Sequence, residues 1–312
     1  MLYSFAGHAS EDGSEPWAGV ALDTSGALFG ATYYGGIWNK GTAFSLSPPA
    51  SAGGPWTETV LHSFGGRGGA SPNAPLLIGG DGQLYSTTAG GGTSHNGTAF
   101  ELIPPAAAER SQWANVVTHD FWGGTGDGAG PQAGIARGSA GVLYGTTYSG
   151  GTSNNGTVFS LTPPASQGVA WTETVLYNFA GGAGDGANPQ GGVVIGPAGV
   201  LCGTTTGGGP ANSGTVFSLA PPASPGGAWT ETVLYSFAGA SDGALPTSLT
   251  IGSDGVLYGT TVRGGTLDGP YCAPLGCGTV FSLAFVAQAR GLPAASQTAR
   301  APFTDHPALP NN

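Results

Sequence analysis

The stretch Leu143-Tyr-Gly-Thr-Thr147, followed after a short loop by Gly156-Thr-Val-Phe159, decides the fold, because close copies of both segments recur along the chain. Each segment is a short apolar and β-branched run bounded by glycine, which is typical of a buried β-strand. Recurrence at a fixed period is the mark of a repeat architecture. Copies of the second segment begin at Gly41, Gly97, Gly156, Gly214 and Gly278, at intervals of 56 to 64 residues.

The repeating unit holds four strand candidates, which are clearest in its third and fourth copies. The second, third and fourth strands of the third copy are predicted at residues 142–147, 157–162 and 171–179. The first strand is the run after a proline-containing loop, as in Gly192-Val-Val-Ile195 of the fourth copy. Four short antiparallel strands joined by turns are typical of a β-propeller blade. A solenoid is the alternative architecture.

The two ends of the repeat array indicate how it closes. Leu2-Tyr-Ser-Phe5 matches the fourth-strand segment Leu234-Tyr-Ser-Phe237, but the fifth unit ends with its third strand at residues 278–283. Truncation of a longer array would produce the same pattern. If the first segment completes the last blade, no sheet edge stays open. The sequence therefore predicts an all-β, five-bladed β-propeller of four-stranded antiparallel blades over residues 1–283, closed by the N-terminal strand, and a flexible tail over residues 284–312.

Composition excludes several classes of partner. The 312 residues include Lys+Arg 7 against Asp+Glu 17, a formal net charge of −10. Nucleic acid and anionic membrane surfaces require clustered basic residues, so neither is an expected partner. The sequence contains no run of 18 apolar residues, so membrane insertion is not expected. The chain opens inside a repeat without a signal peptide, which leaves room for an export signal upstream. A monomer is favoured.

The three cysteines have different expected roles. Cys272 and Cys277 share a loop insertion of the last repeat, at a spacing that a disulfide can close in an oxidising compartment. Cys202 stands where other units have Tyr or Phe, so it is expected to be a buried apolar substitute. The sequence predicts no cofactor and lends no support to Ca²⁺.

Aspartates recur in the loop that leads from each fourth strand to the next first strand. They are Asp12, Asp127, Asp185 and Asp242, with Gly68 in the second unit. In a propeller this loop leaves on the same face as the loop between strands two and three. The carboxylates could therefore form a ring near the channel mouth that holds a cation or binds sugar hydroxyls. The alternative is that each aspartate caps its own turn.

The loop between strands two and three offers amides and aromatic faces, a mixture suited to uncharged polar ligands. Turn formation alone also explains most of its glycines and asparagines. The predicted ligand-binding residues of the two loops together are Tyr33, Tyr34, Asn39, Asp127, Tyr148, Asn154, Asn155, Asp185, Asn212 and Asp242.

Other repeated side chains have structural explanations. Trp56, Trp113, Trp171 and Trp229 begin the outermost strands and are expected to pack between neighbouring blades. Two residues later, Glu58, Glu173 and Glu231 are expected to be solvated and to suppress edge-to-edge association. The five histidines show no pair at metal-ligand spacing, and no nucleophile elbow, phosphate loop or zinc motif occurs. The sequence therefore predicts no catalytic residue.

Leu143-Tyr-Gly-Thr-Thr147, Gly150-Gly151 and Asn155-Gly-Thr-Val-Phe159 resemble the GloVer tandem repeat of bacterial choice-of-anchor proteins. The resemblance covers residues 1–283 in five copies. It implies a secreted or surface-displayed bacterial protein, usually attached by a C-terminal sorting signal, and no defined activity. Residues 284–312 carry no recognisable anchor. Residues 152–159 show a weaker similarity to the Asp-box hairpin of sialidase-type propellers, where that element is structural.

The sequence favours a non-catalytic extracellular binding or adhesion module that engages a glycan or another surface polymer through its loop face. Near-identical loops around a ring suit weak multivalent contacts. The alternative is a secreted carbohydrate-active hydrolase with carboxylates in the central channel, which needs two carboxylates in different environments. Symmetric aspartates match that need poorly. A purely structural surface-layer role is a third interpretation.

Overall fold

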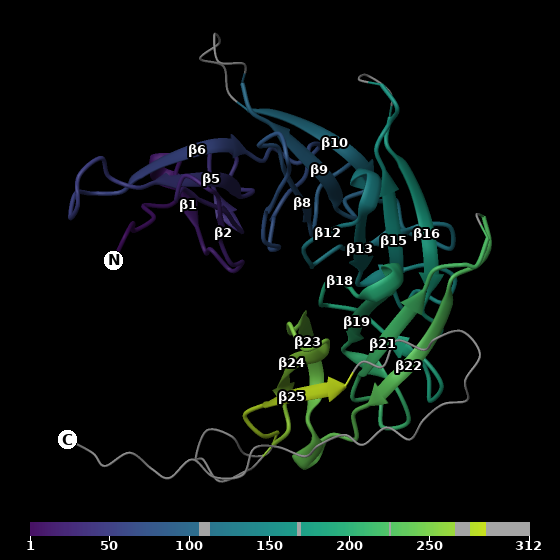
Figure 1. Cartoon of the computed structure of the whole chain (residues 1–312). Helices are drawn as coiled ribbons and strands as arrows, with labels where there is room; N and C mark the ends of the chain where they lie inside the picture. The colour runs from purple at the N-terminus through teal and green to yellow at the C-terminus, as the bar shows by residue number, and fades with distance from the viewer. Residues whose placement is uncertain (106–112, 167–169, 225, 266–274, 285–312) are drawn as a thin grey trace, which may run out of the picture.

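Each copy of the repeat forms one antiparallel sheet, and five such sheets follow each other along the chain. The computed structural model describes residues 1–105, 113–166, 170–224, 226–265 and 275–284. Figure 1 shows the sheets arranged along an open arc, with β10, β16 and β22 on the convex side and β18 and β23 on the concave side. The prediction of an all-β chain of antiparallel four-stranded sheets is confirmed, with three described strands in the fifth.

Within a unit, strands one to four lie side by side in chain order, so each sheet is an antiparallel meander. Unit 1 comprises β2 (Ala21–Leu22), β3 (Leu28–Thr32), β5 (Thr42–Ser47) and β6 (Thr57–Ser63). Unit 2 comprises β7 (Leu77–Ile78), β8 (Leu84–Thr88), β9 (Thr98–Ile103) and β10 (Ala114–Asp120). Unit 3 comprises β12 (Ala136–Arg137), β13 (Leu143–Thr147), β15 (Thr157–Thr162) and β16 (Thr172–Asn178). Unit 4 comprises β18 (Val194–Ile195), β19 (Leu201–Thr205), β21 (Thr215–Ala220) and β22 (Thr230–Ser236). Unit 5 comprises β23 (Ala244–Ile251), β24 (Val256–Arg263) and β25 (Thr279–Ala284).

Short ribbons and turns connect these sheets. Three two-residue pairs form separate ribbons: β1 (Gly13–Ser14) with β4 (Tyr34–Gly35), β11 (Gly128–Ala129) with β14 (Ser149–Gly150), and β17 (Gly186–Ala187) with β20 (Gly207–Gly208). Four 3₁₀ turns complete the described secondary structure: η1 (His8–Ser10), η2 (Ser139–Gly141), η3 (Pro197–Gly199) and η4 (Ala240–Asp242).

A buried pair of threonines explains the most regular part of the repeat signature. Thr147 and Thr157 lie directly opposite each other on β13 and β15, with their Oγ1 atoms 2.8 Å apart. The Thr147 hydroxyl also donates to the carbonyl of Ser149 and accepts from the backbone N–H of Thr157. A hydroxyl satisfied in this way can be buried without the cost of an unpaired polar group. The same Oγ1 contact joins Thr32 to Thr42, Thr88 to Thr98, Thr205 to Thr215 and Thr261 to Thr279.

The glycine of the signature is required by both conformation and space. Gly156 has φ +92°, a region that only glycine adopts readily. A Cβ at this position would clash with the carbonyl oxygen of Thr147 and with Pro189 of the next unit. The chain therefore passes closely between two units here, and the equivalent glycines meet the equivalent prolines in Gly41–Pro72, Gly97–Pro131 and Gly214–Pro246.

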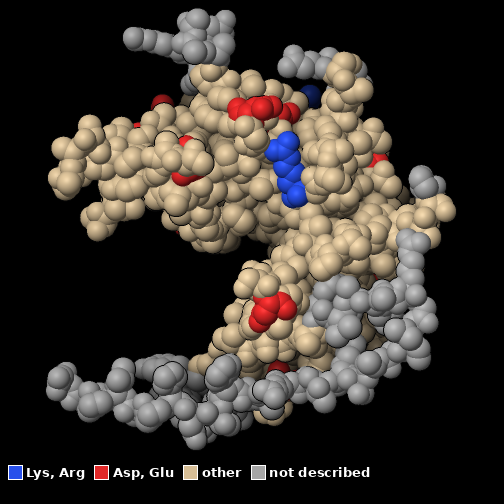
Figure 2. Space-filling model, in the orientation of Figure 1, with Lys and Arg blue, Asp and Glu red and all other residues tan. Residues whose placement is uncertain are grey.

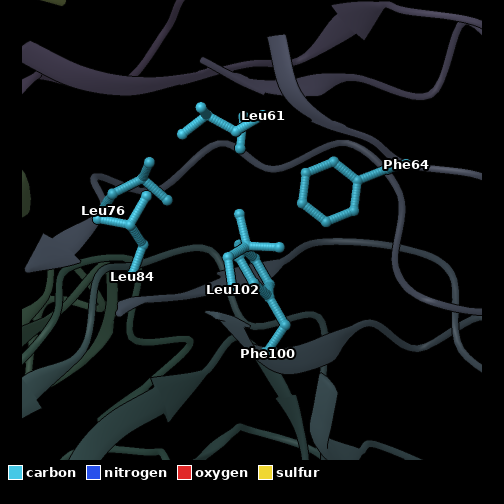
Figure 3. Packing of buried hydrophobic residues seen from close by; sticks show 7 residues of the cluster. Leu61, Phe64, Leu76, Leu84, Phe100 and Leu102 are labelled. Carbon is cyan, nitrogen blue, oxygen red and sulfur yellow. The ribbon is translucent and has the colours of Figure 1, made fainter. Parts of the chain in front are cut away.

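The hydrophobic core lies between neighbouring sheets. Figure 3 shows one cluster, in which Leu61 and Phe64 of unit 1 pack against Leu76, Leu84, Phe100 and Leu102 of unit 2. Strands two and three are buried on both faces, as their continuous apolar runs predict. An edge-to-face phenylalanine pair recurs in these contacts, with ring centroids 5.0–5.1 Å apart, in Phe5–Phe44, Phe64–Phe100, Phe121–Phe159, Phe179–Phe217 and Phe237–Phe281.

Tryptophans at the start of the fourth strands complete this packing. Trp171 contacts Tyr85 of the preceding unit at a centroid distance of 6.0 Å. Trp113 contacts Phe29 and Trp229 contacts Tyr144 in the same way. The expected role of these three tryptophans between neighbouring units is confirmed.

The predicted N-terminal latch does not form in this structure. Residues 1–7 contain no strand, and among the described residues β25 pairs only with β24. Local contacts hold the segment against unit 1 instead, because Phe5 packs on Phe44 and the Tyr3 hydroxyl donates to Asp12. The five sheets therefore form an arc without closure (Figure 1).

The predicted disulfide and the predicted C-terminal tail involve residues that the structure does not describe. Cys272 of the predicted Cys272–Cys277 disulfide lies outside the described residues, as does the predicted tail from residue 285 onward. Cys202 is a free, fully buried thiol whose pKa burial raises to about 12. The thiol therefore packs as an apolar group, as expected.

Candidate functional site

The loops that carry the predicted ligand-binding residues meet along one edge of the sheets. The loop before each first strand pairs with the loop between strands two and three through the two-residue ribbons. Gly13 lies opposite Gly35, Gly128 opposite Gly150, and Gly186 opposite Gly208. The expectation that both loops leave on the same face is confirmed. This edge, called the loop edge below, is the candidate binding surface.

Three of the recurring aspartates, Asp12, Asp127 and Asp185, are buried, Asp242 is half-buried, and all four close their own turns. Asp185 accepts the backbone N–H groups of Ala180 and Gly186 at 2.6 Å each, and the Tyr177 hydroxyl at 3.1 Å. Asp12, Asp127 and Asp242 make the corresponding bond to a backbone N–H at the start of the loop. These contacts correspond to the alternative in which each aspartate caps its turn. Since their oxygens point into the loops, these side chains shape the loop edge from beneath.

Most of the asparagines also serve the loops that contain them. Asn39, Asn154 and Asn212 adopt positive φ, and each Oδ1 accepts the backbone N–H of a glycine four residues earlier. Asn155 reaches further, because its Nδ2 donates to the carbonyl of Ala180 in the following loop. These amides therefore hold the loops in place. The aromatic residues of the loop edge are not used in this way and are more accessible to a ligand.

An aromatic cluster covers the loop edge of unit 1. The rings of Trp17 and Tyr33 are stacked at a centroid distance of 4.3 Å and an interplanar angle of 24°, and Tyr34 packs edge-on against Tyr33 at 4.7 Å. Trp17 is 63% exposed, and Tyr34 is also exposed. Tyr148 occupies the position of Tyr33 in unit 3 and is exposed as well. The stack is a preformed flat apolar surface that faces solvent.

Sequence reasoning missed Trp17, because this residue has no aromatic counterpart in the other units. It follows the loop proline, and the equivalent positions carry Asn73, Gln132, Gln190 and Thr247. The side chains of Gln132 and Gln190 meet across two units, with Nε2 3.3 Å from Oε1. Positions after the loop proline thus lie next to each other in adjacent units. The amides of Gln132 and Gln190 therefore occupy, in units 3 and 4, the positions that are equivalent to Trp17 in unit 1.

A second group of polar residues lies at the junctions between units. At the junctions of units 2 with 3 and 3 with 4, the fourth strand of one unit contributes His or Tyr, the following loop contributes the aspartate, and the fourth strand of the next unit contributes glutamate. Burial, with the nearby Asp185 as a second cause, raises the pKa of Glu231 to about 7. Burial and Asp12 act in the same way on the pKa of Glu58. The expectation that these glutamates are solvated is wrong, because the neighbouring unit covers them.

The junction of units 2 and 3 differs from the others because it contains histidine. His119 Nε2 lies 3.3 Å from each carboxylate oxygen of Asp127, and the two side chains are 14% and 1% exposed. One ligand atom each from His119, Asp127 and Glu173 lies within 4.8 Å of the others. Sequence spacing gave no signal for this cluster, because three strands of unit 3 separate Glu173 from the other two residues along the chain.

The junction of units 1 and 2 lacks both carboxyl groups. Gly68 replaces the aspartate and Asn115 replaces the glutamate. Asn115 Nδ2 donates to the Gly68 carbonyl at 2.9 Å and lies 3.2 Å from His62 Nε2. The aspartate and the glutamate are therefore both absent from this junction, where Asn115 bonds to the loop instead.

The surface has few charged side chains. Figure 2 shows one face, on which scattered acidic and basic groups are separated by wide neutral areas and a broad notch lies between the first and last units. Within the described part of the chain, no helix is long and apolar enough to cross a membrane. This neutral surface suits an uncharged polar ligand better than a polyelectrolyte.

Comparisons with solved structures support a propeller-like fold. A putative 6-phosphogluconolactonase from Bacteroides uniformis ATCC 8492 matches with a TM-score of 0.56 and 12% identity over 95% of this chain and 74% of that chain. A polysaccharide lyase of family PL25, an ulvan lyase, matches with a TM-score of 0.53 and 11% identity over 92% of this chain and 72% of that chain. At these identities the similarity extends to the fold alone.

Sequence comparisons identify the repeat. None of the curated proteins matches the sequence significantly. The sequence model of the Gloeobacter/Verrucomicrobia repeat matches residues 1–184, which is more than half of the chain. The chain therefore belongs to the Gloeobacter/Verrucomicrobia repeat family.

Proposed function

We propose that this protein is a non-catalytic extracellular binding module that engages a glycan or another uncharged surface polymer through its loop edge. The observation that carries the proposal is the stack of Trp17 on Tyr33, which presents a preformed aromatic surface to solvent. Sugar rings have apolar C–H faces that stack on aromatic rings, and their hydroxyl groups bond to amides. The amides of Gln132 and Gln190 lie in the series of positions that begins with Trp17.

Repetition strengthens such contacts. Tyr148 offers a second exposed ring at the position of Tyr33, two units further along. A polymer that reaches both rings would gain affinity, because the second contact is intramolecular once the first has formed. Because few charged side chains lie on the surface, binding of an uncharged polymer is expected to depend little on salt concentration. Binding is therefore expected to be weak for a monosaccharide and much tighter for a polymer.

A closed five-unit ring is the form in which we propose that the module functions. Part of the junction contact set already recurs between the N-terminal segment and unit 1, where Phe5 packs on Phe44 and Tyr3 bonds to Asp12, but contacts that would join unit 5 to unit 1 are apart. Pro16 is equivalent to the prolines that meet the signature glycines, and the three atoms nearest to a Cβ at Gly278 belong to Thr261 and Val262 of its own unit. Val280 is 74% exposed, whereas its counterparts Val158 and Val216 are fully buried against the following unit. Closure would bring these residues of units 1 and 5 together.

The alternative function, a secreted carbohydrate-active hydrolase, needs two carboxyl groups facing the channel. Among the described residues, the Asp–Glu pairs each include a glutamate of a fourth strand, and Figure 1 shows fourth strands on the convex side of the arc. The pairs therefore support a role in joining units. Secretion or surface display in a bacterium is part of the main proposal and is supported by the resemblance to choice-of-anchor proteins.

A glycan array followed by affinity electrophoresis in polysaccharide gels tests the binding function. Trp17→Ala should weaken binding by about tenfold or more, as expected for a central aromatic contact. Tyr258→Ala is the control, because Tyr258 is an exposed aromatic residue of strand β24 and lies outside the loop edge. Tyr148→Ala should weaken binding to long polymers more than to oligosaccharides. Absence of binding to every polymer, or equal binding by Trp17→Ala, would count against the proposal.

A further inference from the structure

We propose that His119, Asp127 and Glu173 form a binding site for a divalent cation of the Zn²⁺ type at the junction of units 2 and 3. The site is independent of the aromatic loop edge and of the proposed glycan binding. One ligand atom from each residue lies within 4.8 Å of the other two, so a single cation can reach all three with small side-chain movements.

The distance between histidine and aspartate fits a shared metal well. His119 Nε2 lies 3.3 Å from both Asp127 oxygens. Two ligands that each lie about 2.0 Å from a tetrahedral Zn²⁺ are about 3.3 Å apart. Hydrogen bonds between nitrogen and oxygen are usually shorter, at about 2.7–3.2 Å. The spacing of the pair therefore fits two ligands of one cation as well as a long hydrogen bond.

Glu173 supplies a buried acceptor. Its Oε1 atom has no hydrogen-bond partner among the described residues, as is also true of the equivalent Oε1 atoms of Glu58 and Glu231. A buried oxygen without a partner is costly, and a bound cation removes this cost. Asp127, by contrast, is held by the backbone N–H groups of Trp122 and Gly128 at 2.8 and 2.6 Å. Such hydrogen bonds orient a metal ligand while leaving lone pairs free.

Among the junctions formed by described residues, this one alone combines the three ligand types. The junction of units 3 and 4 has the same two carboxyl groups, Asp185 and Glu231, but Tyr177 in place of the histidine. The junction of units 1 and 2 has His62 but neither carboxyl group. Junction packing therefore does not require the combination of His119, Asp127 and Glu173.

The donor set selects the class of cation. One imidazole and two carboxylates suit Zn²⁺ and related transition metals, whereas Ca²⁺ and Mg²⁺ prefer oxygen ligands only. Three protein ligands leave a fourth position of a tetrahedral ion open to solvent. The partial exposure of His119 gives a cation access to the cluster.

Isothermal titration of the metal-free protein with Zn²⁺, together with the visible spectrum of the Co²⁺ complex, tests the site. We expect one equivalent to bind at micromolar concentration and to give the intense absorption of tetrahedral Co²⁺. His119→Tyr should weaken binding by at least about 100-fold, since removal of even an outer partner of a ligand typically costs 10- to 100-fold. This variant should fold, because the neighbouring junctions carry tyrosine at the same position.

Two further variants separate the site from adventitious binding. His62→Tyr removes the equivalent histidine of a junction without carboxyl groups and should leave binding unchanged. Tyr177→His should create a second set of ligands with Asp185 and Glu231 and raise the stoichiometry to two. Failure of the natural protein to bind Zn²⁺ overturns the proposal, as does binding that persists in His119→Tyr. Equal affinity for Ca²⁺ that does not depend on His119 overturns the assigned class of metal.

Discussion

His119 Nε2 lies 3.3 Å from the carboxylate of Asp127, in the place where the next junction brings the Tyr177 hydroxyl to 3.1 Å from Asp185. The two junctions thus use different donors to hold the same aspartate. In both, backbone N–H groups provide the remaining contacts. The aspartate is therefore common to these two junctions, whereas the residue opposite it differs.

Asp185→Ala is expected to lower the free energy of unfolding by about 2–3 kcal/mol, because two buried backbone donors and one hydroxyl lose a charged acceptor. Urea denaturation followed by tryptophan fluorescence measures the change. Asp81→Ala is the control, since Asp81 is exposed in a turn and should change stability by less than about 0.5 kcal/mol. Similar effects of the two substitutions would contradict the structural role given to the loop aspartates.

Thr147→Val is expected to cost about 1–3 kcal/mol, because it keeps the shape of the side chain while leaving the Thr157 N–H and hydroxyl with fewer partners. Thermal or urea unfolding gives the value. Thr172→Val replaces an exposed threonine of the same unit and should be close to neutral. A neutral Thr147→Val would mean that the threonine pairs are tolerated and not stabilising.

Gly156→Ala is expected to destabilise the fold severely, because the new methyl group would clash with Thr147 and Pro189 in addition to the strain of positive φ. Gly182→Ala isolates the second effect, since Gly182 has φ +76° but open space around it. Its cost should be about 1–2 kcal/mol. Expression yield and melting temperature distinguish the two variants. Equal losses of stability in both would show that backbone conformation alone explains the glycine at this position of the repeat.

The raised pKa of Glu231 predicts an unusual dependence of the free energy of unfolding on pH. Its folded-state pKa is raised to about 7 by burial and by Asp185, so between its unfolded and folded pKa values the native state binds more protons than the unfolded state. Stability from this group is therefore greatest below the unfolded pKa and is lost as pH rises through 7.

Glu231→Gln mimics the protonated side chain and should become more stable relative to the natural protein by about 1 kcal/mol between pH 5 and 8, a value reduced for partial exposure. Urea titrations at both pH values measure the difference. Glu11→Gln, at an exposed position, serves as the control. A difference that does not grow with pH would show that Glu231 ionises freely in the folded protein.

Val280→Asp tests the proposed ring. If unit 1 covers this residue, as the next unit covers Val158 and Val216, a buried charge should cost more than about 2 kcal/mol. Val262→Asp changes an exposed residue of the preceding strand and should be nearly neutral. If Val280→Asp is equally neutral, the arc of Figure 1 is open in solution.

The repeat pattern was sufficient to predict each sheet. The strands of unit 3 lie within one residue of their predicted limits, because short apolar runs bounded by glycine encode strand and turn locally. The inward packing of Trp171 also followed from repetition, since a side chain that recurs at a strand start needs the same neighbour in every unit.

The sequence could not reveal contacts between units. Glu173 had the pattern of an exposed edge residue, yet the preceding loop covers it. Trp17 had no counterpart from which its role could be inferred, and only the stack on Tyr33 distinguishes it from a surface residue. Both depend on distances between side chains that are far apart in the chain.

The sequence by itself determined the all-β character and the four-stranded unit, because these depend on local periodicity and on turns built from glycine. Only the tertiary structure decided which residues meet at the junctions, including His119 with Asp127, and where residues 2–5 pack. The reason is physical: the core and the polar clusters lie between sheets. The relative placement of two sheets depends on complementary side-chain shape and buried hydrogen bonds, which no single segment encodes.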